Sequence, residues 1–402
     1  MNVLLVAPAY FPAIGGGETH VRVLAEGLAA RGHEVAVLTD RLRPDWPERE
    51  CLNGVAVLRT CRYRAFLDRA DRVPWEECVF GLLREFSELL AGRRVEVVHA
   101  HCQVSAVLGA MMKGSLGCPL VVSLHETEPE RDPMGEGKSR LVCGHLPYDL
   151  LVAGSRFFFR QALRYGTPPE RVRLIHYGVD VSRFAPGVPG GRVRAALGVG
   201  ERQPLVLLVG RFKERKGILE FIRAMSRVAA EVPDVRALVN GSCHSASLDY
   251  LAAVRREIEA RGLGEVVILR EAAWTQEEMP EVYAAADLVV QPSHVEGFGL
   301  AVLEAMAVER PVVGTRTRGI EEIVEHGGNG WLVPVRDAEA LAGAILDLLR
   351  DRDRAAELAR RGREFVERHL SAESMVASTL AAYREILASA RAEPRPPVTA
   401  GI

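Results

Sequence analysis

The hydrophobic residues of this chain form short runs that alternate with longer stretches of helical periodicity. The runs are rich in valine and leucine, as in Leu205-Val-Leu-Leu-Val209, and show no polar alternation. Such continuous apolar runs are typical of parallel strands that are covered on both faces. The repeated order of strand and helix therefore predicts an α/β fold built from doubly wound parallel sheets.

Two series of elements are predicted, separated by a linker at Asp180–Val199, which carries two prolines and four glycines. The first series has strands at Val3–Ala7, Glu34–Thr39, Val95–His99, Leu120–Leu124, Leu150–Ala153 and Val172–Ile175, and helices at Thr19–Ala30, Glu76–Ala91, Ser105–Lys113 and Arg156–Tyr165. The second has strands at Leu205–Val209, Arg236–Val239, Val266–Leu269, Leu288–Gln291, Pro311–Val313 and Leu332–Val333, and helices at Ile218–Glu231, Leu248–Arg261, Glu278–Ala285, Leu300–Glu309 and Ala338–Arg350.

We therefore expect two Rossmann-like domains, at residues 1–180 and 200–370, that face a central cleft. Amphipathic helices are predicted at Arg352–His369 and Ala372–Ser389, and the last one, about 371–390, is expected to pack back on the first domain. Ligands of such sheets bind at the carboxyl ends of the strands.

Composition and charge exclude several classes of function. The formal net charge of −2 over 402 residues argues against general nucleic-acid binding, which usually requires a basic face. Seven scattered cysteines without a Cys-x-x-Cys pair indicate reduced thiols, so we expect a cytoplasmic protein. No run of apolar residues approaches the ~18 that a membrane span requires.

The most informative segment places two carboxylates in Glu296-Gly-Phe-Gly-Leu-Ala-Val-Leu-Glu304. Glu304 is surrounded by apolar residues in a predicted helix, where a buried carboxylate is costly unless a group donates hydrogen bonds to it. Glu296 precedes Gly297 and Gly299, where backbone N–H groups at a helix start can bind an anion. A phosphate site flanked by two acceptors of hydroxyl hydrogen bonds suits a nucleotide sugar.

Two basic residues follow the first strand of the second series. Arg211 leaves the carboxyl end of that strand, and Lys216 precedes a helix, where a cation is unfavourable without a nearby anion. We predict that both bind phosphate, whereas Lys213 and Arg215 are interpreted as a solvated turn. The loop is not a Walker A motif, because the Gly-Lys-Ser/Thr ending is absent.

Histidines and glycines mark the predicted cleft edge of the first domain. His125 ends a predicted strand, and His99 and His101 end its neighbour. We expect the rings of His99 and His101 to point to opposite faces, so no metal site is predicted. The glycines at 15–17 allow a ligand to approach the backbone, although a flexible turn explains them equally well.

Taken together, these motifs resemble a retaining glycosyltransferase of family 4, in the superfamily that includes glycogen synthases and mannosyltransferases. Such enzymes have the GT-B fold of two Rossmann-like domains. The resemblance covers nearly the whole chain and includes the glycine loop, His125, Arg211 with Lys216, the Glu296…Glu304 pair and Gly327-Gly-Asn-Gly-Trp-Leu-Val-Pro334.

The resemblance implies transfer of a hexose or N-acetylhexosamine from a nucleotide sugar, with UDP as the most frequent nucleotide of the family. It implies catalytic roles for His125, Arg211, Lys216 and Glu296, no metal and no further cofactor. The donor-binding residues that it implies are Gly16, Gly17, Arg211, Lys216, Glu296, Gly297, Phe298, Gly299, Leu300 and Glu304. It also implies that the first domain binds the acceptor.

The chain departs from the family pattern at three places. Ile175-His-Tyr-Gly-Val-Asp180 replaces the frequent Ile-Pro-Asn-Gly-Val-Asp, and Arg318-Gly-Ile-Glu-Glu322 replaces Gly-Gly-x-Pro-Glu. The expected base-recognition loop, Arg270–Trp274, lacks the common glycine. These differences leave UDP, GDP and ADP open as nucleotides.

The acceptor and the oligomeric state are not defined by the sequence. The basic, aromatic stretch Arg59–Trp75 fits contact with an anionic acceptor or peripheral contact with a membrane, but a solvated loop and helix fit it better. Glu126–Lys138 is predicted to form a lid on the acceptor side. A UDP-sugar 2-epimerase of the same architecture and a non-catalytic nucleotide-sugar-binding protein remain alternative functions.

Overall fold

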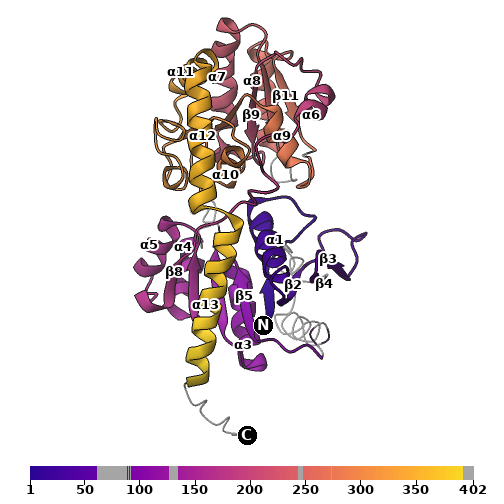
Figure 1. The fold of residues 1–402 in the computed structure, drawn as a ribbon, viewed down its shortest axis with the longest axis vertical. Coiled ribbons are helices and arrows are strands. Elements are labelled where there is room, and N and C mark those ends of the chain that lie inside the picture. Colours follow the sequence, from indigo (N-terminus) through magenta and orange to yellow (C-terminus); the bar gives the residue numbers. More distant parts are fainter. Residues whose placement is uncertain are drawn as a thin grey trace. The chain divides into compact units, whose positions relative to one another are not determined.

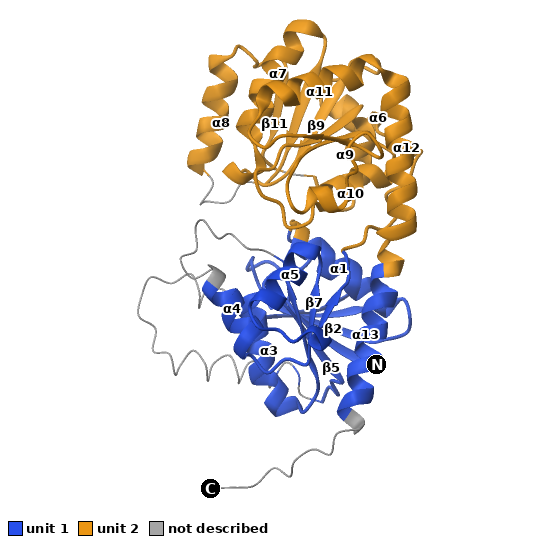
Figure 2. Cartoon of the chain, turned by 90° about the vertical axis from the view of Figure 1, so that its left-hand side faces the viewer, with its two compact units in different colours: residues 1–13, 17–176, 375–402 blue, residues 14–16, 177–374 orange. Residues whose placement is uncertain are grey.

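The computed structural model describes residues 1–60, 88, 90, 92–125, 135–242, 248–272 and 274–392. The chain divides into two units, coloured separately in Figure 2. Unit 1 contains Met1–Ala13, Gly17–His176 and Met375–Ile402, and unit 2 contains Ile14–Gly16 and Tyr177–Ser374. Each unit is built on its own sheet.

The sheet of unit 1 has the strand order β3-β4-β2-β1-β5-β6-β7-β8 over the described residues. Figure 1 labels β2, β3, β4, β5 and β8 of this sheet. All neighbouring strands are parallel except β3 and β4, which are antiparallel. The strands are β1 (Asn2–Val6), β2 (Glu34–Asp40), β3 (Arg49–Leu52), β4 (Val55–Thr60), β5 (Val97–His101), β6 (Leu120–Leu124), β7 (Leu150–Ala153) and β8 (Val172–Leu174).

The helices of unit 1 cover both faces of this sheet. They are α1 (Gly16–Ala29), α3 (Gln103–Leu116), α4 (Gly135–His145), α5 (Arg156–Arg164), the 3₁₀ turn η1 (Pro169–Arg171) and the greater part of α13 (Ala372–Ala392). Alternate residues of β1 enter different cores, because Leu4 and Val6 pack in one cluster and Val3 and Leu5 in the other. The sheet is therefore buried on both sides, as its continuous apolar runs predict.

Helix α13 joins the core of unit 1 from the far end of the sequence. Val376, Leu380 and Tyr383 are buried in the same cluster as the apolar face of α1. The Tyr383 hydroxyl lies 2.6 Å from Nδ1 of His99, which is itself buried in β5. The C-terminal helix is thus held by apolar packing and by a buried polar contact.

Unit 2 contains a parallel sheet with the order β11-β10-β9-β12-β13-β14. Leu205 and Leu207 of β9 belong to one apolar cluster, and Val206 and Leu208 to the other. The strands are β9 (Leu205–Val209), β10 (Arg236–Asn240), β11 (Val267–Arg270), β12 (Leu288–Gln291), β13 (Val312–Thr315) and β14 (Trp331–Val333). The helices are α6 (Gly191–Ala196), α7 (Ile218–Glu231), α8 (Leu248–Ala260), α9 (Met279–Ala285), α10 (Leu300–Ala307), α11 (Ala338–Arg350) and α12 (Arg352–His369), with 3₁₀ turns η2 (Glu214–Lys216) and η4 (Ile320–Glu322).

Helix starts follow local capping chemistry. The side chain of Asp337 accepts a hydrogen bond from the backbone N of Ala340 at the start of α11. Asp351 does the same for Arg354 at the start of α12. These caps satisfy N–H groups that have no partner inside the helix. They explain why the predicted bounds of both helices match the structure.

Three features differ from the sequence-based expectations. Asp180–Val199 is not a free linker, because it lies in unit 2 and buries Phe184 and Val193 in the core. The antiparallel pair β3–β4 was not predicted, since its short strands join through Asn53-Gly54 without a long apolar run. Helices α4 and α6 were also missed, because neither has a clear apolar period. The predicted helix Glu76–Ala91 lies largely outside the described residues.

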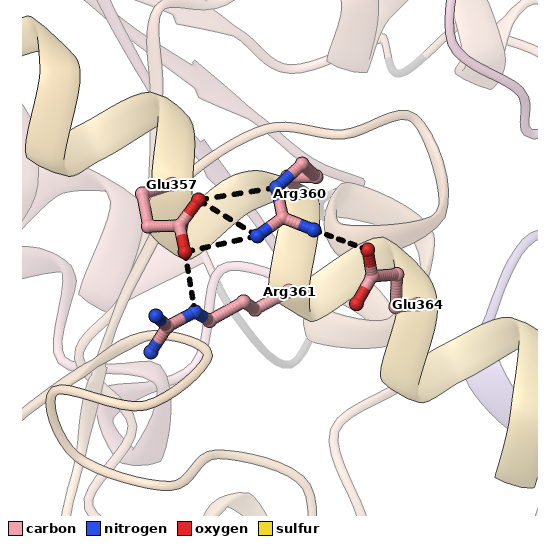
Figure 3. A network of polar contacts seen from close by, with 4 residues as sticks. All are labelled: Glu357, Arg360, Arg361 and Glu364. Carbon is pink, nitrogen blue, oxygen red and sulfur yellow. Dashed lines mark hydrogen bonds and ion pairs between the residues drawn. The ribbon is translucent and has the colours of Figure 1, made fainter.

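Helix α12 carries an exposed network of charged side chains (Figure 3). Glu357 accepts hydrogen bonds from Arg360 and Arg361, and Arg360 also pairs with Glu364. All four side chains are at least 42 % exposed. Exposed pairs at this spacing contribute little to folding, so the network is a solvated helix surface.

We expect Tyr383→Phe to lower the free energy of unfolding by about 1–3 kcal/mol, because buried His99 loses a hydrogen-bond partner. Chemical denaturation of the whole chain measures this change. Arg360→Ala is the control and should leave stability unchanged within error, since its network is solvated. A Tyr383→Phe variant as stable as the parent would contradict a docking role for this contact.

Candidate active site

A loop of unit 2 connects β12 to α10 and carries the first carboxylate. Glu296 accepts a hydrogen bond from Lys216 Nζ at 2.6 Å and from Ser293 Oγ at 3.1 Å. Both ion-pair partners are largely buried, with side-chain exposures of 14 % for Lys216 and 13 % for Glu296. The loop ends at Gly299, whose φ of 110° favours glycine at the start of α10.

Lys216 is positioned by the turn that follows β9. The 3₁₀ turn η2 ends at Lys216, and Gly217 then adopts a left-handed φ of 67° before α7 begins. A Cβ on Gly217 would lie 1.9 Å from the carbonyl oxygen of Pro292. The turn therefore packs directly on the backbone beyond β12, which brings Lys216 to Glu296.

The electrostatics of this ion pair favour a further anion. Burial, together with the positive charges of Arg215 and Arg211, lowers the pKa of Lys216, against the opposite effect of Glu296. Burial would raise the pKa of Glu296, but Lys216 and Arg215 hold it below its ordinary value. Lys216 and Arg215 thus act on the carboxylate, and Arg211 and Arg215 act on Lys216. Cations gathered in this way suit a diphosphate.

The second carboxylate, Glu304, lies in α10 and accepts a hydrogen bond from the Tyr283 hydroxyl at 2.6 Å. Tyr283 is fully buried in α9. Burial raises the pKa of Glu304 to about 7, against the lowering effects of Tyr283 and the charge of Arg183. The carboxylate that the sequence predicts to be buried is therefore partly buried in the structure, and the Tyr283 hydroxyl and the charge of Arg183 only partly offset its desolvation.

The turn after β13 packs on the Glu296 loop. A Cβ on Gly319 would lie 2.6 Å from the backbone N of Phe298 and 2.7 Å from the carbonyl oxygen of Glu296. The Phe298 side chain points into the core, where its ring contacts that of Tyr177 edge-on, with centroids 5.1 Å apart. Phe298 therefore offers only its backbone to a ligand.

In unit 1, the carboxyl ends of β5 and β6 hold a group of histidines. His101 Nδ1 lies 2.8 Å from His125 Nε2, and the two rings are stacked. The expectation that His99 and His101 point to opposite faces was wrong, because their ring centroids are only 4.1 Å apart. Both residues are inside β5, where residues two apart share a face.

The structure thus brings together part of the predicted site. Lys216, Glu296 and the backbone of Gly297–Leu300 form one region of unit 2, which continues along α10 to Glu304. Gly16 and Gly17 are the first residues of α1, and His125 and Gly17 belong to unit 1. Residues that sequence reasoning missed are Ser293, Tyr283 and Arg215. Ser293 was visible as a polar residue just beyond a strand, but Tyr283 is brought in only by packing.

Two predicted acceptor segments lie mostly outside the described residues, namely Arg59–Trp75 and Glu126–Lys138. Arg59 itself is described and is buried, with its guanidinium paired to Glu50 and donating to the carbonyl oxygen of Phe11. It is therefore a structural residue of β4 and not part of a basic surface.

Two family models match the chain. Residues 14–183 match the "Glycosyltransferase Family 4" model, and residues 192–365 match the "Glycosyl transferases group 1" model. The chain is 32 % identical to a D-inositol 3-phosphate glycosyltransferase of Thermobispora bispora over 370 residues, covering 86 % of this chain and 84 % of the relative. A protein of the same name from Nocardioides sp. is also 32 % identical, over 94 % of this chain and 86 % of its own length.

Solved structures show the same architecture. Sucrose-phosphate synthase from Thermosynechococcus elongatus has a TM-score of 0.83 and 25 % identity, covering 96 % of this chain and 99 % of its own. HepE from Anabaena, solved with UDP-glucose, has a TM-score of 0.75 at 21 % identity, covering 97 % of this chain and 100 % of its own, and supports the fold alone.

The chain belongs to the family 4 (group 1) glycosyltransferases. The predicted GT-B fold and the predicted class of enzyme, a retaining transferase that uses a nucleotide-sugar donor, are confirmed. The relatives favour a transferase over the epimerase and binding-protein alternatives. Over the described residues, none of the helices has the length and apolar character needed to cross a membrane.

We expect Gly217→Ala to destabilise the protein and to disrupt the Lys216–Glu296 pair, because Cβ would collide with Pro292 and the backbone φ is positive. The melting temperature measures the effect. Gly343→Ala in α11 is the matched control, since its Cβ meets nothing within 4 Å. That change should add up to about 1 kcal/mol of stability through helix propensity. Equal effects of the two substitutions would refute the proposed close packing.

The Glu304 carboxyl should make stability depend on pH. Its folded-state pKa of about 7 lies above the ordinary value of 4.5, so the folded chain binds more protons between these values. Its contribution to stability is complete at acid pH and is lost as the pH rises toward about 7. We therefore expect Glu304→Gln, which cannot ionise, to gain melting temperature relative to the parent as the pH rises from 5 to 8. A pH-independent difference between the two proteins would show that this carboxyl is not perturbed.

Proposed function

We propose that this enzyme transfers a hexose or N-acetylhexosamine from a UDP-sugar to a hydroxyl acceptor, with retention of anomeric configuration. The observation that supports the donor site most strongly is the buried Lys216–Glu296 pair, on which Arg215 and Arg211 add positive charge. The structure around it supports binding of a doubly charged diphosphate.

We propose a role for each of the donor-site residues in unit 2. Arg211 and Lys216 bind the diphosphate and stabilise the charge that develops on it as the glycosidic bond breaks. Glu304 accepts hydrogen bonds from the ribose hydroxyls. Glu296 and the backbone of Gly297–Gly299 hold the donor sugar. Nucleotide binding thereby supplies to Glu304 the donors that a buried carboxylate requires.

The chemistry follows from the charge of the site. Breaking the bond to the anomeric carbon leaves negative charge on the diphosphate oxygen, beside Lys216. The acceptor hydroxyl attacks the same face of the sugar, and the departing diphosphate takes its proton. This route requires no separate base, and we propose that it requires no metal, because protein cations neutralise the leaving group. His125 of unit 1 is proposed to contact the transferred sugar, and the backbone at Gly16 and Gly17 the diphosphate.

The acceptor class that we propose to test first is a phosphorylated polyol. Relatives at 32 % identity are named for D-inositol 3-phosphate. We further propose a cytoplasmic location. Vesicle flotation tests for peripheral membrane contact, and light scattering measures the oligomeric state.

Lys216→Ala and Arg211→Ala are each expected to lower kcat by about 100-fold or more, because each removes stabilisation of the departing diphosphate. The melting temperature should change little by comparison. Steady-state kinetics with UDP-glucose and D-inositol 3-phosphate measure turnover. Lys213→Ala, from the same turn, is the matched control and should retain activity. Near-parental turnover in the Lys216 variant would remove its assigned role.

Two experiments identify the nucleotide and distinguish a transferase from an epimerase. A thermal-shift panel of UDP, GDP and ADP with their sugar conjugates identifies the base, and Glu304→Gln should abolish most of the shift with the correct nucleotide. NMR of the donor incubated without acceptor should show at most slow hydrolysis. Conversion of the donor to its C2 epimer would instead establish the epimerase.

A further inference from the structure

Three histidines of unit 1 bring their ring nitrogens together. His20 of α1, His101 of β5 and His125 just beyond β6 each offer one ligand nitrogen, and these three atoms lie within 4.8 Å of one another. The side chains come from three different elements that meet at the carboxyl edge of the sheet. His20 is 7 % exposed and His101 is 1 % exposed, while His125 is partly exposed.

The three rings lie close to one another. His101 and His125 are stacked, with centroids 5.1 Å apart and planes 7° apart. The His20 ring lies 5.0 Å from that of His125 and 5.6 Å from that of His101. Nε2 of the buried His101 has no hydrogen-bond partner among the described residues. A buried polar nitrogen in this position calls for a ligand.

Burial disfavours the charged form of these histidines and lowers the pKa of all three. Neutral imidazole is the form that coordinates metal ions, and ring nitrogens that converge from three elements are a typical ligand set for such an ion.

The neighbouring residues distinguish these three histidines from His99. His99 has both nitrogens in protein contacts, with Nδ1 at 2.6 Å from Tyr383 Oη and Nε2 at 2.8 Å from Ser123 Oγ. The His99 ring packs against that of His101, and neither of its nitrogens is left for a ligand. Cys102, directly after His101, has φ 83° and ψ 170°, a region that non-glycine residues rarely adopt. Strain of this kind is found preferentially at functional sites.

We propose that His20, His101 and His125 bind one Zn²⁺ ion, or another transition-metal ion that prefers imidazole. Zn–N bonds of about 2.0–2.1 Å in tetrahedral geometry place the ligand nitrogens roughly 3.3 Å apart, and the present nitrogens lie within 4.8 Å of one another. A metal-bound imidazole coordinates through one nitrogen and can keep a proton on the other.

Two consequences follow for the ion and for activity. Mg²⁺ prefers oxygen ligands and is not expected to bind. Zn²⁺ would engage His125, which the proposed function assigns to the transferred sugar. If that assignment is correct, Zn²⁺ inhibits transfer, and this consequence alone rests on the proposed function.

The test is a Zn²⁺ titration of the full chain, freed of metal by a chelator and monitored by competition with a chromophoric chelator. One equivalent should bind, with no competition from Mg²⁺. His125→Gln and His20→Asn should each weaken affinity by more than about 10-fold, since loss of a ligand exceeds loss of a supporting contact. His145→Gln, which removes an exposed histidine, and Cys51→Ser, which removes an exposed thiol, are the matched controls and should bind as the parent does. Unchanged affinity in both cluster variants overturns the site.

A second measurement requires no substitution and so does not depend on the variants folding. X-ray absorption of the Zn²⁺-bound parent protein should show three imidazole nitrogens in the first shell. Sulfur in that shell, or fewer than two imidazoles, overturns the proposal. Transfer activity is measured separately in the presence of chelator. Its loss there would count against the proposed function and leave the metal-site result unaffected.

Discussion

The proposed donor region depends on one buried ion pair, between Lys216 and Glu296. It connects the turn after β9 to the loop after β12, so it defines the relative position of the two segments that the proposed ligand would touch. Both charges lie mostly out of water, where their attraction must compensate for lost hydration. Arg211 and Arg215 add positive charge near Lys216. The anionic ligand that we propose would reduce the repulsion among these cations.

Glu304 is a second charged group that the folded chain stabilises incompletely. Its carboxylate lies in an apolar helix, where Tyr283 supplies a single hydroxyl donor. A carboxyl that tends to stay protonated in the ligand-free protein is poorly stabilised as an anion. Ribose hydroxyls would supply the missing hydrogen bonds. A loss of folding stability of this kind is common where residues are selected to bind a ligand.

The carboxyl edge of the sheet in unit 1 carries a group of histidines instead of a buried ion pair. Four histidines are packed there, and burial lowers the pKa of each of them. His99 is satisfied by Ser123 and by Tyr383 of the C-terminal helix, which couples the last helix of the chain to the interior of the sheet. Each of the remaining three has one ring nitrogen within 4.8 Å of the others, and this is the set that we propose to bind a metal ion.

The sequence by itself determined the α/β class and the order of most strands and helices, and its motifs predicted Arg211, Lys216, Glu296 and Glu304 as donor-binding residues. These properties are local, because apolar periodicity, glycines and caps act within a few residues. Only the tertiary structure decided that Asp180–Val199 packs into unit 2, that Tyr283 meets Glu304, that Phe298 faces the core, and that His20 joins His101 and His125. Each of those contacts joins residues far apart in the chain, whose meeting depends on how whole elements pack. A pattern that extends over a few neighbouring residues does not encode those contacts.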